Sequence, residues 1–146
     1  MTREESVAAL LRSQSTLALT TCAEDGTPQV APLFYLPGEG LSVYWFSSAS
    51  SAHSRALRRN PAAAVTVYRS TEHWREICGV QMRGTVTAVT DRAERRAVAE
   101  AYAERFHLGK LFEHAIGHSR LYLFQPSWLR YIDNSRRFGY RFEISL

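Results

Sequence analysis

The sequence has only two cysteines, Cys22 and Cys78, and they form neither a CxxC pair nor a metal-binding spacing with histidine. We expect both to be small buried side chains, with a disulfide or reactive thiol as the minor alternative. No apolar run is long enough for a transmembrane helix. The first residues carry acids directly after Arg3 and too short an apolar stretch for a signal peptide. We therefore expect a cytoplasmic protein with no membrane contact.

The chain also lacks a block of like charge and the common hydrolytic motifs. Its net charge is +4, but arginine is spread along the chain, which disfavours nucleic acid as a partner. The last quarter mixes aromatics with four arginines that we assign to a solvated strand face: Arg130, Arg136, Arg137 and Arg141. There is no Walker loop, Ser-His-Asp order or pair of acids on one helix face, so hydrolysis and phosphoryl transfer are poorly supported. A modest positive field suits a small anionic ligand.

What is present suits a single soluble domain. The chain has 146 residues, of which 45% are hydrophobic and 22% charged. A chain of this length buries roughly 68 to 70% of its unfolded surface and needs no disulfide or metal. No repeat, linker or low-complexity segment divides residues 1–146.

The stretch 44–61 changes at its middle from a strand pattern to a helix pattern. We call its central part the serine hinge, and its polar residues are Ser47, Ser48, Ser50, Ser51, His53, Ser54 and Arg55. Hydroxyls, free N–H groups at a helix start, the helix dipole and two cations all favour a bound anion, most often a phosphate. Simple capping of a surface helix by the serines is the equally weighted alternative.

Periodicity predicts strands joined mostly in sequence. The strand patterns cover 17–22, 28–36, 41–46, 62–68, 77–90, 120–124, 128–134 and 140–144, with a bend or bulge expected at 125–127, and the helix patterns cover 3–13, 51–59, 91–106 and part of 107–118. Asp91 and Glu94 have the spacing of a capping box, and Tyr102 and Phe106 are expected to face inward on the helix that follows. Pro32 places the second strand at an edge, at a bulge or beside a ligand, and Gly84 marks a bend. We therefore predict a mainly β fold with peripheral helices, an antiparallel barrel of six or seven strands.

Three runs occur in a characteristic order: HS-x-AL-x-x-NP at 53–61, GVQ-x-x-G at 79–84 and IDN-x-x-x-FG at 132–139. In this order the chain resembles the pyridoxamine 5'-phosphate oxidase-like flavoproteins, and most closely a bacterial branch other than the vitamin-oxidising enzyme itself. The resemblance implies a Greek-key, FMN-binding split barrel that forms a homodimer, with FMN at the interface and a small-molecule substrate. The implied activity is oxidoreduction between a reduced nicotinamide or small substrate and an acceptor.

The resemblance also implies where FMN binds. The phosphate is expected at the serine hinge, the flavin ring over the strand that contains Pro32, and a carboxamide from the partner subunit at the ring's polar edge. The expected contacts are Ala31, Pro32, Leu33, Phe34, Phe46, Ser47, Ser48, Ser51, His53, Ser54, Arg55, Trp74 and Gln81. For Trp74 a plain role at the dimer interface, and for Gln81 a solvated position, remain open.

Two departures from the family's pattern bear on function. His53 stands where the family commonly has a phosphate-binding lysine, so that its charge depends on pH. The tail 128–139 lacks the Arg-x-His-x-Arg-like substrate clamp, so pyridoxamine phosphate is not the expected substrate. The alternatives are a non-catalytic flavin or haem carrier or sensor, and a deazaflavin-dependent reductase. His114 and His118 have a spacing that suits haem or a metal, but no further ligand accompanies them, so no metal and no catalytic residue is assigned.

Overall fold

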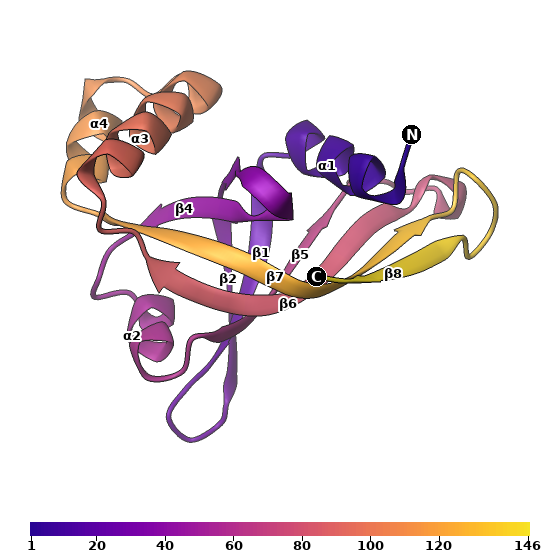
Figure 1. The fold of residues 1–146 in the computed structure, drawn as a ribbon, viewed down its shortest axis with the longest axis horizontal. Coiled ribbons are helices and arrows are strands. Elements are labelled where there is room, and N and C mark those ends of the chain that lie inside the picture. Colours follow the sequence, from indigo (N-terminus) through magenta and orange to yellow (C-terminus); the bar gives the residue numbers. More distant parts are fainter.

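The computed structural model covers residues 1–146 and shows one antiparallel sheet that curls into a split barrel (Figure 1). The strands are β1 (Thr16–Cys22), β2 (Pro28–Phe34), β3 (Leu36–Pro37), β4 (Val43–Ser47), β5 (Ala62–Tyr68), β6 (Cys78–Ala88), β7 (Arg120–Asp133) and β8 (Arg141–Ser145). Their order in the sheet is β2-β1-β5-β6-β7-β4-β3, and β8 also pairs with β7. The predicted fold class, a mainly β split barrel, is confirmed.

Tyr35 joins the two ends of the sheet. β2 and β3 are the outermost strands in the sheet order, yet only this residue separates them along the chain. Its side chain is fully buried, and its hydroxyl donates a hydrogen bond to the carbonyl of Leu11. The chain itself therefore closes the barrel here. β2 pairs with β1 alone, so the barrel stays split along the other edge of β2.

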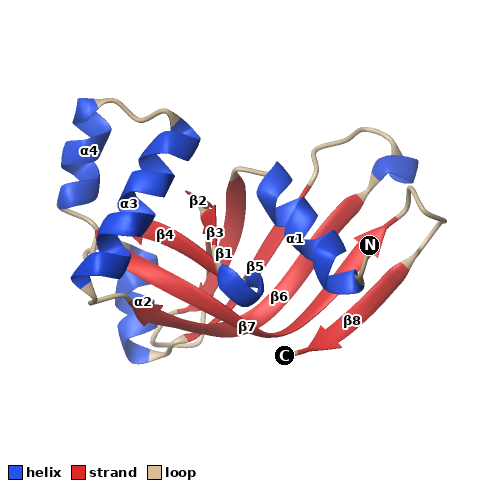
Figure 2. Cartoon of the chain, turned by 45° about the horizontal axis from the view of Figure 1, so that its top comes forward, coloured by secondary structure: helices blue, strands red, loops and turns tan.

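Four helices accompany the sheet: α1 (Arg3–Ser13), α2 (Ala52–Arg59), α3 (Arg92–Phe106) and α4 (Lys110–Gly117). A capping box between Thr2 and Glu5 starts α1, which buries Val7, Leu10 and Leu11 in the core. Figure 2 shows α1 lying over the hollow of the curled sheet, with α3 and α4 together at one end. None of the helices is long and apolar enough to cross a membrane.

β6 and β7 form the long central pair of the sheet, and their register contains a bulge. We predicted strands at 120–124 and 128–134 with a bend or bulge between them. The bulge is confirmed, but the two segments form one continuous strand. Gly84 pairs with Pro126 and Arg83 with Trp128, so that Ser127 is accommodated as an extra residue and β7 continues. A Cβ at Gly84 would collide with the carbonyl of Gln125, which confirms the bend predicted at this glycine.

Other differences from the predicted elements are local. Leu41 ends a short 3-10 turn (Glu39–Leu41) instead of starting a strand, and Leu36 belongs to β3. Pro32 lies on the edge strand β2, as predicted. Cys78 is buried as expected, but Cys22 is exposed, because it is the last residue of β1 beside the hairpin. Both cysteines are free.

Candidate functional site

The serine hinge connects β4 to α2, and its serines do cap the helix. Ser51 is the N-cap, and its Oγ accepts a hydrogen bond from the backbone N–H of Ser54 at 3.2 Å. The same Oγ lies 2.7 Å from Ser54 Oγ and 2.8 Å from the carbonyl oxygen of Ser48. Ser54 is 0% exposed, so this part of the hinge is structural. The capping role considered for these serines is therefore real.

Capping leaves two donors free at the start of α2. The backbone N–H groups of Ala52 and His53 have no partner within the chain. They point out of the helix at its positive end, where an anion is stabilised by the helix dipole. Ser48 and Ser50 hold their hydroxyls 2.8 Å apart on the exposed side of the same loop. The hinge thus keeps an anion-binding arrangement in addition to its cap.

His53 is held against the strand that precedes the hinge. Its Nε2 lies 2.8 Å from the Oγ of Ser47, the last residue of β4. The ring is half-buried, and this burial lowers the pKa of His53 below its usual value. In the absence of a ligand the imidazole is therefore biased toward its neutral form. An adjacent dianion has the opposite effect on the imidazole pKa.

The arginines of α2 bond to the hinge itself. The guanidinium of Arg55 donates to the carbonyl of Ser50 at 2.7 Å, and that of Arg58 donates to the carbonyl of Ala49 at 2.8 Å. Both arginines are exposed, and these bonds fix the loop between β4 and α2. The positive charge is thus fixed beside the free N–H groups.

An aromatic wall continues from the hinge to β2. Phe46 packs edge to face with Tyr102 at 5.2 Å between ring centroids, as Tyr102 does with Phe106 at 4.8 Å. Phe106 lies tilted against Phe34 at 4.6 Å. Helical spacing predicted that Tyr102 and Phe106 face inward, but it did not show that they join the strands expected to contact a flavin. In β2 the exposed Pro32 and Phe34 alternate with half-buried residues, so the strand presents an apolar row.

The structure brings most of the predicted site residues together but places Gln81 and Trp74 away from the others. The residues of β2, β4 and α2 lie around the hinge and the aromatic wall. Gln81 is exposed on β6, opposite Thr66 and Arg130. Trp74 lies in the 3-10 turn Trp74–Glu76, directly before β6. Figure 1 shows the start of β6 at the end of the molecule away from α2.

The length of β7 measures this separation. Ser47 pairs with Arg120, the first residue of β7, and Cys78 pairs with Asp133, the last. A strand of this length spans roughly 40 Å. A flavin ring system is several times shorter, so one bound flavin cannot touch both Ser47 and Trp74 of the same chain.

Asn134 of the IDN run builds the end that carries Trp74, a role that the sequence did not reveal. Its side chain donates to the carbonyl of Trp74 at 2.8 Å and accepts from the N–H of Gly139 at 3.0 Å. Its own N–H donates to the carbonyl of Ile77 at 2.8 Å. These bonds present Trp74 and Phe138 as an edge-to-face pair with centroids 5.4 Å apart. The two rings are 54% and 78% exposed.

His114 and His118 lie on the exposed face of α4 and at its C-cap, with ring centroids 4.6 Å apart. No group of three or more histidine, cysteine or acidic side chains in the chain is arranged to hold a metal ion. The histidine pair therefore lacks further protein ligands.

Comparisons with known proteins agree with this architecture. Residues 4–133 match the family described as pyridoxamine 5'-phosphate oxidase, and the chain belongs to this family. The pyridoxine/pyridoxamine 5'-phosphate oxidase of Nitrobacter hamburgensis is 33% identical over 99 residues. The match covers 67% of this chain but only 42% of that enzyme.

Two solved structures show the same fold at low sequence identity. A conserved hypothetical protein of Mycobacterium tuberculosis superposes with a TM-score of 0.81 at 18% identity, covering 92% of this chain and 86% of its own. A heme binding protein of Mycobacterium smegmatis gives a TM-score of 0.76 at 15% identity, covering 99% of this chain and 58% of its own. These likenesses establish the split barrel and leave the ligand open.

Proposed function

We propose that the protein binds FMN non-covalently between two copies of the chain and acts as an oxidoreductase. The observation that carries this proposal is the start of α2, where two free backbone N–H groups, the Ser48 hydroxyl and His53 converge next to an apolar strand and an aromatic wall. A phosphate and a flat ring joined by a short chain require this pairing of surfaces.

The distance between the serine hinge and the pair Trp74 and Gln81 supports a second copy of the chain at the site. Proteins of this fold family are commonly dimeric. In a two-fold dimer, Gln81 and Trp74 of the partner subunit reach the ring that the hinge of the first subunit holds. The carboxamide of Gln81 both donates and accepts, which matches the carbonyl and imide groups at the edge of a flavin.

When bound, FMN supplies the electron and hydride chemistry. The chain's residues bind and orient. The hinge holds the phosphate, β2 and Phe46 carry the ring, and Tyr102 and Phe106 keep water from its outer edge. No side chain of the hinge is placed as a general acid or base. Pyridoxamine phosphate is not proposed as the substrate, because residues 128–139 carry no run that resembles the family's clamp.

Absorption and thermal unfolding test the proposal. The purified protein, after incubation with FMN and removal of free ligand, is expected to show flavin absorption bands, and FMN is expected to raise its melting temperature in a concentration-dependent way. Riboflavin, which lacks the phosphate, should stabilise it much less. A colourless protein whose melting temperature is the same with and without FMN contradicts the proposal. Bleaching of the bound flavin by NADPH in stopped flow separates an enzyme from a carrier.

Haem binding is the second candidate. It is favoured by the exposed pair of His114 and His118 and by the likeness to a heme binding protein. An intense Soret band after incubation with haemin, lost in His114→Ala and His118→Ala, would support it. Titration with haemin and FMN together shows whether the two ligands exclude each other, because α4 ends three residues before Arg120, which pairs with Ser47 of the hinge.

A further inference from the structure

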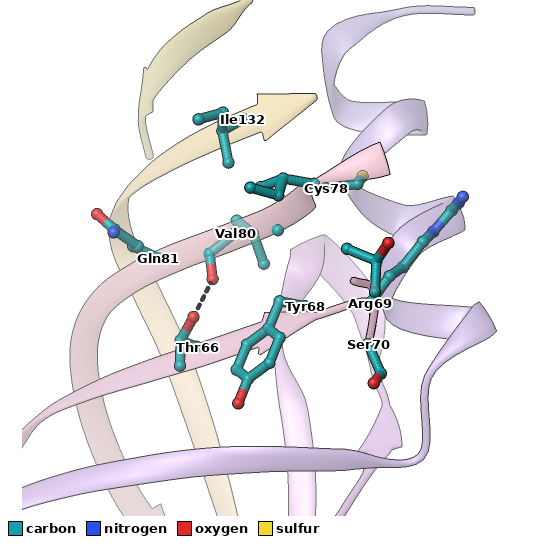
Figure 3. Close-up of a pocket in the computed structure, with 11 residues that line it drawn as sticks. Thr66, Tyr68, Arg69, Ser70, Cys78, Val80, Gln81 and Ile132 are labelled. Carbon is teal, nitrogen blue, oxygen red and sulfur yellow. Dashed lines mark hydrogen bonds between the residues drawn. The ribbon is translucent and has the colours of Figure 1, made fainter. Parts of the chain in front are cut away.

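A groove on the outer face of β5 and β6 is built around Gly79 of the GVQ run (Figure 3). In the sheet, Tyr68, Gly79 and Ile132 lie side by side on three neighbouring strands. A Cβ at Gly79 would stand only 2.9 Å from the Cβ of Tyr68. Glycine at position 79 therefore leaves room for the ring of Tyr68 on the neighbouring strand. No side chain covers the floor of the groove between Tyr68 and Ile132.

The groove has the size and lining of a small-molecule site. Its volume is about 400 Å³, and small ligands commonly bind in cavities of roughly 300 to 1,000 Å³. Tyr68 is 63% exposed and Ile77 is 41% exposed, so two apolar walls face solvent without a partner. Gln81 lies one pleat further along the same face of β6. A flat ring fits between such walls over a floor without side chain.

One cation of the groove is uncompensated. Arg69 lines it, and the guanidinium makes no ion pair and no hydrogen bond within the chain. Arg130, opposite Gln81, is neutralised by Glu143 at 2.7 Å. Glu76 is hydrogen-bonded to a residue that lines the groove, but that residue is Thr71 and not Arg69. Arg69 thus marks the end of the groove where an anionic group is favoured.

We propose that this groove binds a small planar acid, with its ring over Gly79 against Tyr68 and its carboxylate on Arg69. The carboxamide of Gln81 is left for a polar atom on the far side of the ring. The proposal that the groove binds such an acid does not depend on the proposed function. As the substrate site of a flavoenzyme it rests on the proposed function, because Gln81 is also the residue assigned to the ring at the partner's hinge.

Titration calorimetry with nicotinate and nicotinamide tests the proposal, because the two probes share one ring and differ in charge. The wild-type protein is expected to bind nicotinate at least about tenfold more tightly than nicotinamide, the size expected for a charge-assisted pair. Arg69→Ala should reduce nicotinate affinity to that of nicotinamide. Arg75→Ala is the matched control, since Arg75 stacks on Trp74 at 5.0 Å outside the groove, and it should leave both affinities unchanged.

Equal affinity for the two probes, no binding of either, or an unchanged affinity in Arg69→Ala would each overturn the proposal. Gly79→Ala is expected to abolish binding by filling the floor, and Arg69→Gln provides a second test that does not depend on folding of the glycine variant. FMN affinity, measured on the same variants, separates the two proposals. Loss of nicotinate binding with FMN affinity retained supports the groove, whereas a protein that binds nicotinate through Arg69 but no FMN refutes only the flavin assignment.

Discussion

His53 Nε2 and Ser47 Oγ, 2.8 Å apart, tie the first turn of α2 directly to the last residue of β4. The imidazole is half-buried there, and this burial lowers the pKa of His53. A phosphate dianion at the hinge favours the protonated ring, so that binding takes up a proton. We therefore expect the affinity for a phosphate ligand at the hinge to depend on pH.

FMN affinity is expected to increase as the pH is lowered from about 8 to about 6.5, because the protonated His53 binds the dianion more strongly. Fluorescence titration at several pH values measures this. His53→Ala should bind FMN more weakly, with an affinity that no longer changes over this range. Riboflavin, without phosphate, should show no such dependence in either protein. An identical slope in His53→Ala would place the phosphate elsewhere.

The stability of the protein without ligand should change with pH in the opposite sense. In the unfolded chain the histidine has its ordinary pKa of 6.5, while burial lowers the pKa in the folded state. The unfolded state then binds more protons, and the free energy of unfolding falls as the pH drops below about 6.5. Urea unfolding above and below this value measures the slope. We expect a shallower slope in His53→Ala, and an unchanged slope would argue against the burial.

Ser51→Ala is expected to weaken both folding and ligand binding. It removes the N-cap of α2, which costs about 1 kcal/mol of unfolding free energy, and it loosens the loop that presents the free N–H groups. Thr2→Ala removes the N-cap of α1 and is the matched control. It should cost a similar free energy and leave FMN affinity unchanged. Equal FMN affinity in both variants would mean that the hinge is a cap only.

Asn134→Ala should destabilise the protein by about 2 to 3 kcal/mol, because three backbone groups lose a partner or its geometry. The emission of Trp74 should shift as its turn becomes mobile, and a variant that keeps Trp74 as the sole tryptophan isolates this signal. Phe138→Ala, at a site exposed to solvent, should change stability by less than about 0.5 kcal/mol. An Asn134→Ala protein with the unfolding free energy of the wild type would contradict this structural role of Asn134.

Gly84→Ala is expected to be severely destabilising, by roughly 3 kcal/mol or more, since the added methyl group meets the backbone of Gln125 at the bulge. Gly117→Ala, in the last turn of α4 with open space around it, should be neutral or stabilise by up to about 1 kcal/mol. Denaturant unfolding compares the two. Equal effects would show that the bulge is not constrained at this glycine.

Local chemistry made much of the fold predictable. Ser51 before α2, Asp91 before α3 and the bend at Gly84 all act through neighbours in sequence or through the residue's own shape, and each was expected. Even so, the capping box predicted at Asp91 is only half formed. Glu94 donates its N–H to Asp91, while its carboxylate accepts a hydrogen bond from the distant Tyr44. The carboxylate of Glu94 thus bonds to Tyr44 of β4 and not to the backbone N–H of Asp91.

The contacts that could not be predicted are those between distant elements. The helical face of Tyr102 was evident, but its contact with Phe46 depends on how α3 returns to the sheet. The bond of Asn134 to Trp74 joins the loop between β7 and β8 to the turn before β6, two segments whose closeness no local pattern encodes. The hinge itself was evident from the sequence, whereas the aromatic wall that continues from it to β2 came only from the tertiary structure.

The pairing of β4 with β7 has a consequence for the order in which the molecule forms. Val43 pairs with Phe124 and Ser47 with Arg120, so the main neighbour of β4 is a segment more than seventy residues later in the chain, and only the two residues of β3 pair with it locally. Such distant pairings carry a large loop-closure cost and form late in folding. The hinge is anchored on β4. We therefore expect the phosphate site to mature only in the final folding step, so that FMN accelerates no early event and acts by slowing unfolding.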